Sequence, residues 1–335
     1  FARRKKRFAF ASSDVIDTDI ENLKIIVTPP VLSINWLPEG ILYRRLQGIN
    51  KKIVAQILKQ IVKKYNIRNY LFINSFNFYY PCMEALLNAD LSIYHCVDPL
   101  AFSFERKHGL MSEEMIVRDS DLVVCTGKKL YDEKRKLNVN TFFIPNAADL
   151  AHSQKALDVN LPVHDLLLHI PKPVIGYFGN IERRMDYDML KQVIELQPGK
   201  SFCFVGPQSP EHIPLWFYEN PNIYLTGPVP YEQMPSVLKG FDVAMIPFKK
   251  DDISGNIFPL KLFAYLGAGK PVVATDFNPD LSAFTGRSVL YCSDARSFSD
   301  AITTSLIDDT EQHKAKRLDI AGQNTWEIRS REFGD

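Results

Sequence analysis

Short apolar runs alternate with helical patterns along almost the whole chain, and this alternation restricts the possible folds more than any other feature. The apolar runs of the first half lie at residues 23–28, 70–74, 91–97, 121–125 and 141–145. Helical periodicity lies between them, near 42–65, 81–89, 112–119 and 127–136. Because runs without polar residues are typical of parallel strands covered on both faces, this order predicts a doubly wound α/β domain.

The alternation stops at residues 161–173, where Pro162, Pro171 and Pro173 indicate a linker. It then restarts, with strands expected at 173–179, 201–206, 222–227, 241–248, 270–276 and 288–292. Helices are expected at 186–195, 231–239, 258–268 and 295–308, and a mostly helical tail follows Thr310. The sequence therefore predicts Rossmann-like domains over 1–165 and 171–320, and a final helix within 321–335. Two such domains facing across a cleft would bind a ligand at the carboxyl ends of their strands.

Composition and charge exclude several classes of protein. The 335 residues are 46% hydrophobic and 24% charged, as in ordinary globular proteins, and no apolar run reaches the ~18 residues of a membrane-spanning helix. The first 68 residues carry 14 basic and 5 acidic side chains. This excess favours a phosphate-rich or anionic membrane partner, and a solvated charged face is the alternative. No nucleic-acid-binding module is recognisable, so nucleic acid is not expected as a partner.

The cysteines and the N-terminus bear on the compartment. The five cysteines are Cys82, Cys96, Cys125, Cys203 and Cys292. They form no CxxC pair and no spacing typical of metal ligands, which predicts no metal site and a reducing, cytoplasmic environment. FARRKKRFAF lacks the apolar core of a signal peptide. Because the chain starts at Phe1, we expect the native N-terminus and the first strand of the domain to be missing. The basic segment favours peripheral attachment to the inner face of the membrane.

The segment 251–276 carries the strongest chemical signal. A polar loop leads into a helix with Pro259 in its first turn, where the backbone N–H groups have no intrahelical partner. These groups and the helix dipole favour a bound anion, and Lys261 adds a full positive charge. The spacing therefore predicts a phosphate site. The alternative is an ordinary amphipathic helix with Lys261 exposed.

A second candidate is VIGYFGN, which ends in Gly179 and Asn180 and is followed by Arg183 and Arg184. A glycine at a strand end lets a ligand approach the backbone, although the pattern is weaker than a GxGxxG. The pattern predicts a ligand contact at this strand end, and chance is the alternative.

A third candidate is NIYLTGPVPYEQMP, in which Gly227, Pro228 and Val229 follow a strand. Exposed backbone groups in this loop could contact the edge of a nucleobase. The alternative is a plain connection between a strand and a helix.

The third candidate stands just before NIFPLKLFAYLGAGKPVVATD, with FDVAMIPF between the two. Together these segments resemble the C-terminal half of group-one glycosyltransferases of the teichuronic-acid and exopolysaccharide type. YFGNIERRMDYDML and DSDLVVCTGKKLYDEKRKLNVNTFFIPNAADL are similar to the same branch, so the resemblance extends from about residue 70 to 330. It implies the GT-B fold, with the final helix at 321–335 crossing back to the N-terminal domain. It also implies transfer of a sugar from a nucleotide diphosphate sugar, with no cofactor and no bound metal.

The sequence departs from this family at one helix. Members have two Glu residues eight positions apart, and alignment on Gly269 places them at Asn256 and Ala264. The second Glu is thought to hold the ribose, which Ala264 cannot do. Loss of such buried hydrogen bonds would cost roughly 2–6 kcal/mol if nothing replaced them. A more distant branch, similar to the xanthan glucuronosyltransferase, also lacks this Glu and contacts the diphosphate with a Lys that Lys261 matches.

The resemblance and the loop pattern together define the expected donor site. The residues concerned are Gly179, Asn180, Arg183, Arg184, Gly227, Pro228, Val229, Ser254, Asn256, Ile257, Phe258, Pro259 and Lys261. Lys261 and the free N–H groups would stabilise the leaving diphosphate, and Ser254 and Asn256 would bind sugar hydroxyls.

In the N-terminal half, HCVDP closes an expected strand and carries His95 and Asp98. The family has an acidic residue or a His near this point, so we expect one of them to contact the sugar, with Asp98 the first choice as general base if the reaction inverts. The alternative is that His95 is a half-buried strand residue. The PNAAD turn at Asn146 resembles the family's PNGVD, with Ala147 in place of Gly, and a structural role is expected.

Basic and aromatic residues gather in the N-terminal half, in the lysine-rich segment 51–64 and in a loop with Phe76, Phe78, Tyr79 and Tyr80. This mixture favours a lipid-linked or saccharide acceptor at a membrane surface. The resemblance to group-one glycosyltransferases implies a metal-independent transferase and favours retention of the anomeric configuration. Two alternatives stay open, namely a catalytically silent nucleotide-sugar-binding protein or partner subunit, motivated by Ala264, and a nucleotide-sugar epimerase of the same fold.

Overall fold

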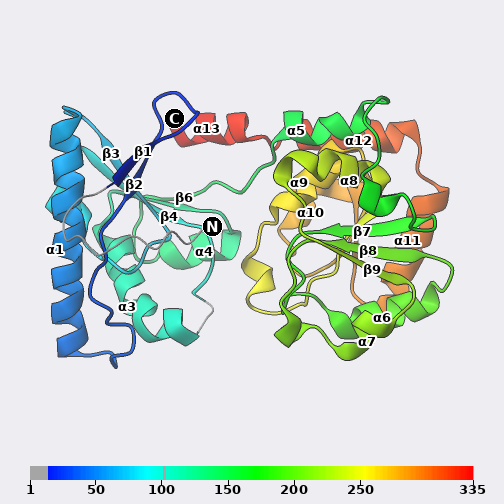
Figure 1. The fold of residues 1–335 in the computed structure, drawn as a ribbon, viewed down its shortest axis with the longest axis horizontal. Helices are drawn as coiled ribbons and strands as arrows, with labels where there is room; N and C mark the ends of the chain where they lie inside the picture. The colour runs from blue at the N-terminus through cyan, green and yellow to red at the C-terminus, as the bar shows by residue number, and fades with distance from the viewer. Residues whose placement is uncertain (1–13, 101–102, 335) are drawn as a thin grey trace. The chain divides into compact units, whose positions relative to one another are not determined.

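The computed structural model describes residues 14–100 and 103–334. The chain divides into two compact units, the first made of 1–125 and 130–142 and the second of 126–129 and 143–335. Figure 1 shows both as α/β units in which helices cover strands. The basic segment expected to precede the first strand lies outside the described residues.

The first unit contains a short parallel sheet and a separate hairpin. Its elements are β1 (Asp14–Asp17), β2 (Lys24–Val27), α1 (Ile41–Lys64), β3 (Leu71–Ser75), α2 (Glu84–Leu87), β4 (Leu91–Cys96), α3 (Ser103–Asp119), β5 (Leu122–Cys125), α4 (Lys128–Lys134) and β6 (Thr141–Phe143). The sheet has the order β3-β4-β5-β6, and the β3–β4 and β4–β5 pairs are parallel, as predicted. The described strands of this unit follow chain order without a reversal.

The run at 23–28 corrects one expectation. We predicted a buried strand of the parallel sheet, but β2 pairs antiparallel with β1 and stands outside that sheet. Ile25 and Val27 are 52% and 46% exposed. The run is apolar enough to form a strand, but hydropathy does not specify which neighbour the strand pairs with.

The aromatic loop after β3 is also more buried than expected. Phe78 is buried in a core cluster with Tyr94 and Ile116, and its ring stacks on Tyr79 with centroids 4.7 Å apart. Phe78 therefore serves packing rather than an exposed surface, whereas Tyr79 keeps an exposed edge.

The second unit is a larger Rossmann-like sheet covered by helices. Its elements are α5 (Leu150–Gln154), β7 (Val174–Phe178), α6 (Tyr187–Leu196), β8 (Ser201–Val205), α7 (Leu215–Glu219), β9 (Ile223–Gly227), α8 (Met234–Gly240), β10 (Val243–Ile246), α9 (Leu260–Gly267), β11 (Val272–Thr275), α10 (Leu281–Thr285), β12 (Val289–Cys292), α11 (Ala295–Ile307), α12 (Glu311–Gly322) and α13 (Trp326–Gly334). All pairs are parallel in the order β12-β11-β10-β7-β8-β9. The order reverses between β7 and β10, which creates a topological switch point at their carboxyl ends.

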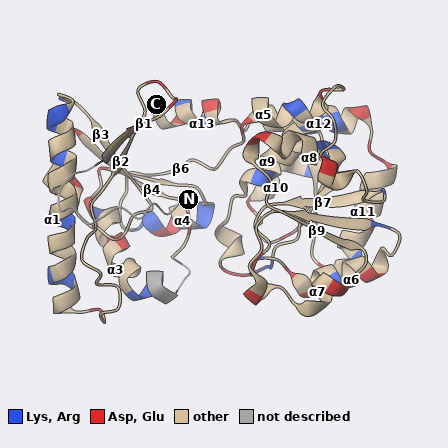
Figure 2. Ribbon diagram, in the orientation of Figure 1, with Lys and Arg blue, Asp and Glu red and all other residues tan. Residues whose placement is uncertain are grey.

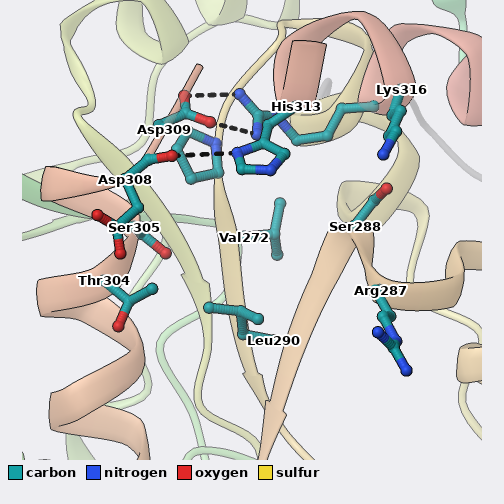
Figure 3. A pocket seen from close by; sticks show the side chains of 12 residues that line it. Val272, Arg287, Ser288, Leu290, Thr304, Ser305, Asp308, Asp309, His313 and Lys316 are labelled. Carbon is teal, nitrogen blue, oxygen red and sulfur yellow. Dashed lines mark hydrogen bonds and ion pairs between the residues drawn. The ribbon is translucent and has the colours of Figure 1, made fainter. Parts of the chain in front are cut away.

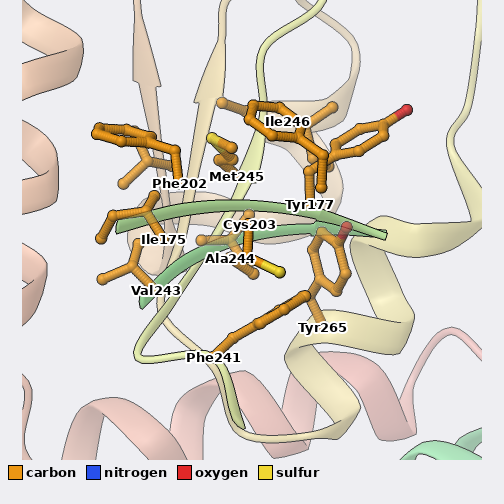
Figure 4. Packing of buried hydrophobic residues seen from close by; sticks show 14 of the residues in the cluster. Ile175, Tyr177, Phe202, Cys203, Phe241, Val243, Ala244, Met245, Ile246 and Tyr265 are labelled. Carbon is orange, nitrogen blue, oxygen red and sulfur yellow. The ribbon is translucent and has the colours of Figure 1, made fainter. Parts of the chain in front are cut away.

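The centre of this sheet is buried on both faces. Figure 4 shows Phe241 and Tyr265 on one side of the strands and Phe202 and Met245 on the other. Gly176 in β7 makes room for Phe241, because a Cβ there would lie 2.2 Å from ring atoms of that side chain. A rigid double-sided core thus supports the strand ends where the switch point lies.

The unit boundary lies earlier than the predicted linker. Residues 143–170 belong to the second unit, and Ala156, Leu167 and Ile170 are buried in the same core cluster as Val174. The segment at 161–173 is therefore a packed connection that contains a 3₁₀ turn at Asp165–Leu167. The expected helical tail is present as α12 and α13.

Candidate functional site

Three glycines line the carboxyl ends of three neighbouring strands, of which β7 borders the switch point. Gly179, Gly206 and Gly227 follow or end β7, β8 and β9 with φ angles of 139°, 148° and 77°. The Gly179 N–H donates to the Val205 carbonyl, and the Gly206 N–H donates to the Gly227 carbonyl, both at 2.9 Å. The strand ends therefore present backbone without side chains, so a ligand can approach closely.

Gly206 was missed by the reasoning from sequence. A Cβ at this position would lie 2.1 Å from the Gly179 carbonyl oxygen, so only glycine fits between the two strand ends. The signal was present, because VIGYFG, SFCFVG and NIYLTG all end in glycine. Each run was read as a separate strand, and their shared ending was not compared.

Lys261 points from the first turn of α9 back to the end of β7. Its Nζ donates to the Tyr177 hydroxyl at 2.6 Å, and lies 3.8 Å from the Tyr177 ring centroid and 5.1 Å from that of Phe248. Gly179 leaves room for it, since a Cβ there would lie 2.5 Å from this Nζ. The half-buried lysine contradicts the alternative of an exposed residue on an ordinary amphipathic helix.

The electrostatic environment of Lys261 lacks a close anion. Burial lowers the pKa of the Lys261 ammonium well below its usual value, the positive Arg184 lowers it further, and Glu182 opposes both. Among the described residues no carboxylate forms an ion pair with Lys261. An anionic ligand at this strand end would supply the missing counter-charge and raise the pKa again.

The two arginines after β7 differ in role. Arg184 contacts the Glu182 carboxylate, and its guanidinium carbon lies 5.8 Å from the Phe248 ring centroid. It is therefore held close to Lys261 but already partnered. Arg183 is half-buried, and Asn180 is exposed with its carbonyl accepting from the Tyr177 hydroxyl at 2.9 Å.

The loop before α9 contains buried polar atoms without partners. Ser254 and Asn256 are 0% and 5% exposed, and among the described residues Ser254 Oγ and Asn256 Oδ1 have no hydrogen-bond partner. The Asp251 carboxylate orders this loop by accepting from the N–H groups of Ile253 and Ser254, at 3.1 and 2.7 Å. Buried unpaired oxygens cost free energy, which is typical of positions that gain a partner in another state.

Two asparagines fix the rest of this loop. Asn278 donates to the Ile257 carbonyl at 3.0 Å, and Asn146 donates to the Phe258 carbonyl at 2.9 Å. Pro259 then caps α9 without a side-chain hydrogen bond. The Leu262 N–H donates to the Pro259 carbonyl at 3.1 Å, which leaves the N–H groups of Leu260 and Lys261 available in the first turn. Asn146 has the structural role expected for the PNAAD turn, whereas Asn278 was not singled out from sequence.

The loop after β9 is held by packing at its far end. Pro228 is exposed and Val229 packs against the core. His152 stacks on Tyr231 with ring centroids 4.1 Å apart, and a ring nitrogen lies 2.8 Å from the Tyr231 carbonyl. The start of the helical segment that follows is thereby fixed relative to α5.

Ala264 faces the core from α9. It is 9% exposed and belongs to the large apolar cluster of the second unit. A longer acidic side chain at this position would start from within that cluster, so the helix presents no carboxylate here.

His95 and Asp98 belong to the first unit. His95 is the last residue but one of β4 and lies next to its register partner Ser75, with 3.2 Å between Nδ1 and the Ser75 hydroxyl. It is half-buried, and burial lowers the pKa of its imidazole. Asp98 is exposed two residues after the strand. His95 is thus a half-buried strand residue, as the alternative interpretation predicted. Its contact with a ligand stays a prediction.

One group of potential metal ligands exists among the described residues. Side-chain atoms of Cys82, Glu84 and Asp119 lie within 4.8 Å of one another. Cys82 Sγ lies 3.1 Å from the Asp119 carboxylate, and burial together with this neighbour raises the pKa of the thiol to about 11. A protonated thiol is a poor metal ligand.

No helix of the described chain is long and apolar enough to cross a membrane.

Comparison with known proteins finds similarity to one family in the second unit. Residues 172–308 match the family model described as glycosyl transferases group 1. Over 212 residues the chain is 27% identical to TuaH of Bacillus subtilis (strain 168), whose name assigns it to teichuronic acid biosynthesis as a glycosyltransferase. The match covers 59% of this chain and 53% of that protein, so the chain spans about half the length of this relative.

Solved structures show the same fold at low sequence identity. Sucrose-phosphate synthase from Thermosynechococcus elongatus superposes with a TM-score of 0.71, 17% identity, and coverage of 96% of this chain and 84% of that one. HepE of Anabaena in complex with UDP gives a TM-score of 0.62 and 13% identity, over 83% and 81% of the two chains. The fold is GT-B, with two Rossmann-like units, as predicted.

Proposed function

We propose that this chain transfers a sugar from a nucleotide diphosphate sugar to a saccharide or lipid-linked acceptor, because residues 172–308 match the family model of glycosyl transferases group 1. The observation that carries the proposal is Lys261, which is half-buried at the switch point of the second unit and forms no ion pair with a carboxylate of the described residues. Ligands of doubly wound sheets bind at this edge. HepE, which shares the fold, is named in complexes with UDP and UDP-glucose.

In this proposal the diphosphate lies against the ends of β7 and α9. As the bond to the sugar breaks, negative charge grows on the diphosphate. Lys261 and the first-turn N–H groups of α9 stabilise that charge more than the charge of the intact donor. Gly179, Gly206 and Gly227 keep the backbone accessible to the ligand. The chemistry needs no metal, since these groups neutralise the leaving group, and we propose retention of the anomeric configuration.

The donor sugar extends from the diphosphate to the loop before α9. Ser254 Oγ and Asn256 Oδ1 would gain hydroxyl partners there when the loop opens, which relieves their unpaired state. Pro228 and Val229 would border the base. Asp98 is the candidate general base if the reaction inverts, because it is exposed at a strand end of the first unit.

The acceptor belongs to the first unit in this proposal. Figure 2 shows basic residues and no acidic ones along α1, in agreement with its sequence. Such a helix favours an anionic acceptor or membrane surface. Vesicles containing an anionic lipid test this attachment, with neutral vesicles as the control, and binding that does not depend on anionic lipid would contradict it.

The first test is a titration with UDP and with uridine, by calorimetry and without added metal. Lys261→Ala should weaken UDP binding about 10- to 100-fold and leave uridine binding nearly unchanged, because the lost contact is a charged hydrogen bond to phosphate. Lys191→Ala, an exposed lysine on α6, is the matched control. Equal losses for UDP and uridine would remove the phosphate role of Lys261.

Turnover is then measured with UDP-sugars and acceptor extracts. Transfer that Lys261→Ala slows, with Lys191→Ala at the level of the natural chain, supports the transferase. A chain that binds UDP but transfers no sugar would instead be a silent nucleotide-sugar-binding protein. Ala264 favours this second candidate, since α9 offers no carboxylate to a ribose.

A further inference from the structure

The second unit has a cavity at the opposite end of its sheet from the glycine turns. Its volume is about 290 Å³, and it lies where β11 and β12 begin. Figure 3 shows Val272 and Leu290 between two polar walls. These two side chains give the cavity an apolar base that neither Lys261 nor the loop before α9 borders.

One wall is basic. Arg287 and Ser288 precede β12, and Lys316 from α12 extends toward Ser288 in Figure 3. Neither Arg287 nor Lys316 has an ion-pair partner within the part of the chain that the structure describes. Two cations on the rim of one cavity, with a hydroxyl between them, favour an anionic group.

A third cation of the cavity is fully partnered and serves the fold. Arg317 donates to both oxygens of the Asp309 carboxylate, at 2.7 and 2.8 Å, and to the Gly269 carbonyl at 3.1 and 2.8 Å. Arg317 therefore has all its partners within the fold, whereas Arg287 and Lys316 have no ion-pair partner among the described residues.

The wall that faces the basic one carries hydroxyl and carboxylate groups. Thr304, Ser305 and Asp308 come from the last turn of α11 and its cap, and they lie across from Lys316 in Figure 3. In the described structure their side chains form no hydrogen bond. His313 is engaged with the Asp308 carbonyl at 3.1 Å, which fixes this wall. Two hydroxyls and a carboxylate are typical groups for binding sugar hydroxyls.

We propose that this cavity binds a phosphorylated monosaccharide. The phosphate contacts Arg287, Ser288 and Lys316, while the hydroxyls of the sugar contact Ser305 and Asp308. The C–H face of the ring packs on Val272 and Leu290. A volume of about 290 Å³ is at the low end for ligand pockets, which suits one sugar ring with a phosphate and excludes a nucleotide sugar. This proposal does not depend on the transferase activity.

The experiment is a titration with glucose 6-phosphate and glucose 1-phosphate, with glucose and inorganic phosphate as partial ligands. We expect a sugar phosphate to bind at least 10-fold more tightly than either partial ligand. The double variant Arg287→Gln, Lys316→Gln should weaken it at least 10-fold. Asp308→Asn should weaken it less, and Lys191→Gln should have no effect. The four substituted residues are exposed, so the variants should fold, and far-UV circular dichroism checks this.

Three outcomes would overturn the proposal. The first is that neither sugar phosphate binds below 10 mM. The second is that inorganic phosphate binds as tightly as the sugar phosphates, which would indicate a plain anion site. The third is displacement of the sugar phosphate by UDP, which would place it at the switch point instead. Failure of UDP to bind at all would affect the transferase alone and leave this test intact.

Discussion

The two units of the molecule bury their apolar side chains in different ways. Among the described residues, the second unit has one continuous core that runs through both faces of a six-stranded sheet. The first unit has three separate clusters, around Phe78, Val54 and Tyr43. The first strand of its parallel sheet, β3, exposes Leu71 and Ile73. A continuous core tolerates fewer changes than several small clusters do, because its side chains interlock in all directions.

The difference bears on where a demanding site can be built. A lysine held against two aromatic rings requires a scaffold that does not relax around it. Only the second unit has, in its described part, a reversal of strand order and a core that supports the strand ends from both faces. The predictions that follow test whether the contrast in packing is real and whether it is tied to function.

The largest expected effect is that of Gly206→Ala. The new Cβ would meet the Gly179 carbonyl oxygen at 2.1 Å, a backbone atom that cannot turn aside. We expect a loss of about 3 kcal/mol or more in the free energy of unfolding, together with loss of UDP binding. Gly199→Ala is the control, because a Cβ there has nothing within 4 Å. Urea denaturation of both variants makes the measurement, and equal stability would show that the strand ends are not in close contact.

The next effect compares one substitution in the two units. Leu262→Ala removes a fully buried side chain from the continuous core and should cost about 4 kcal/mol, while Leu87→Ala in a small cluster of the first unit should cost about 2 kcal/mol. Hydrogen exchange read by mass spectrometry reports each unit separately. Similar losses at both positions would contradict the contrast in packing.

A smaller effect of opposite sign is expected at Lys261. Folding disfavours the buried ammonium, so Lys261→Met should raise the stability of the free protein by about 1 kcal/mol while it weakens UDP binding. The pKa is lower in the folded than in the unfolded state. The charged Lys261 therefore lowers the free energy of unfolding by its full amount at pH values below its pKa in the folded state. This loss of stability disappears as pH rises from that pKa toward the pKa of the unfolded state, near 10.5. Melting curves of both chains across this range should converge at high pH, and a constant difference would exclude the charge as its cause.

The smallest expected effect is a proton taken up on UDP binding. An anion beside Lys261 raises the lowered pKa of its ammonium, so at pH values between the free and bound pKa the complex gains up to one proton. Calorimetry in buffers of different ionisation enthalpy measures this uptake. Lys261→Met should abolish it, and Lys191→Met should retain it. Proton release by the natural chain would show that another group dominates.

Much of the second unit could be predicted from sequence because its signals are local. Buried strands such as β8 and β10 have continuous apolar runs, and the predicted strands from 173 to 292 all occur within a few residues of their expected bounds. The loop before α9 and the helix that follows it were also predicted, since Pro259 and Lys261 are close in sequence, and the phosphate site there stays a prediction. The run that contains β2 is also apolar, and its pairing with β1 was not predictable from hydropathy.

The parts of the candidate site that were missed depend on contacts between distant residues. Gly206 matters because β8 ends beside β7, and Asn278 matters because its side chain reaches the Ile257 carbonyl. Neither residue stands in a recognisable pattern of its own. The packing of 143–170 on the second unit was missed for the same reason, since prolines at 161–173 suggested a boundary that the buried Leu167 and Ile170 contradict.

The sequence by itself determined the alternation of strands and helices and the glycines at the strand ends, because hydropathy period and backbone freedom are properties of neighbouring residues. The tertiary structure decided the strand order, the burial of Lys261 against Tyr177, and the cavity between β12, α11 and α12. Lys261 and Tyr177 are 84 residues apart, and their contact exists only because β7 and β10 lie side by side in the sheet. Which strands become neighbours depends on the packing of the whole unit, and local periodicity does not encode it.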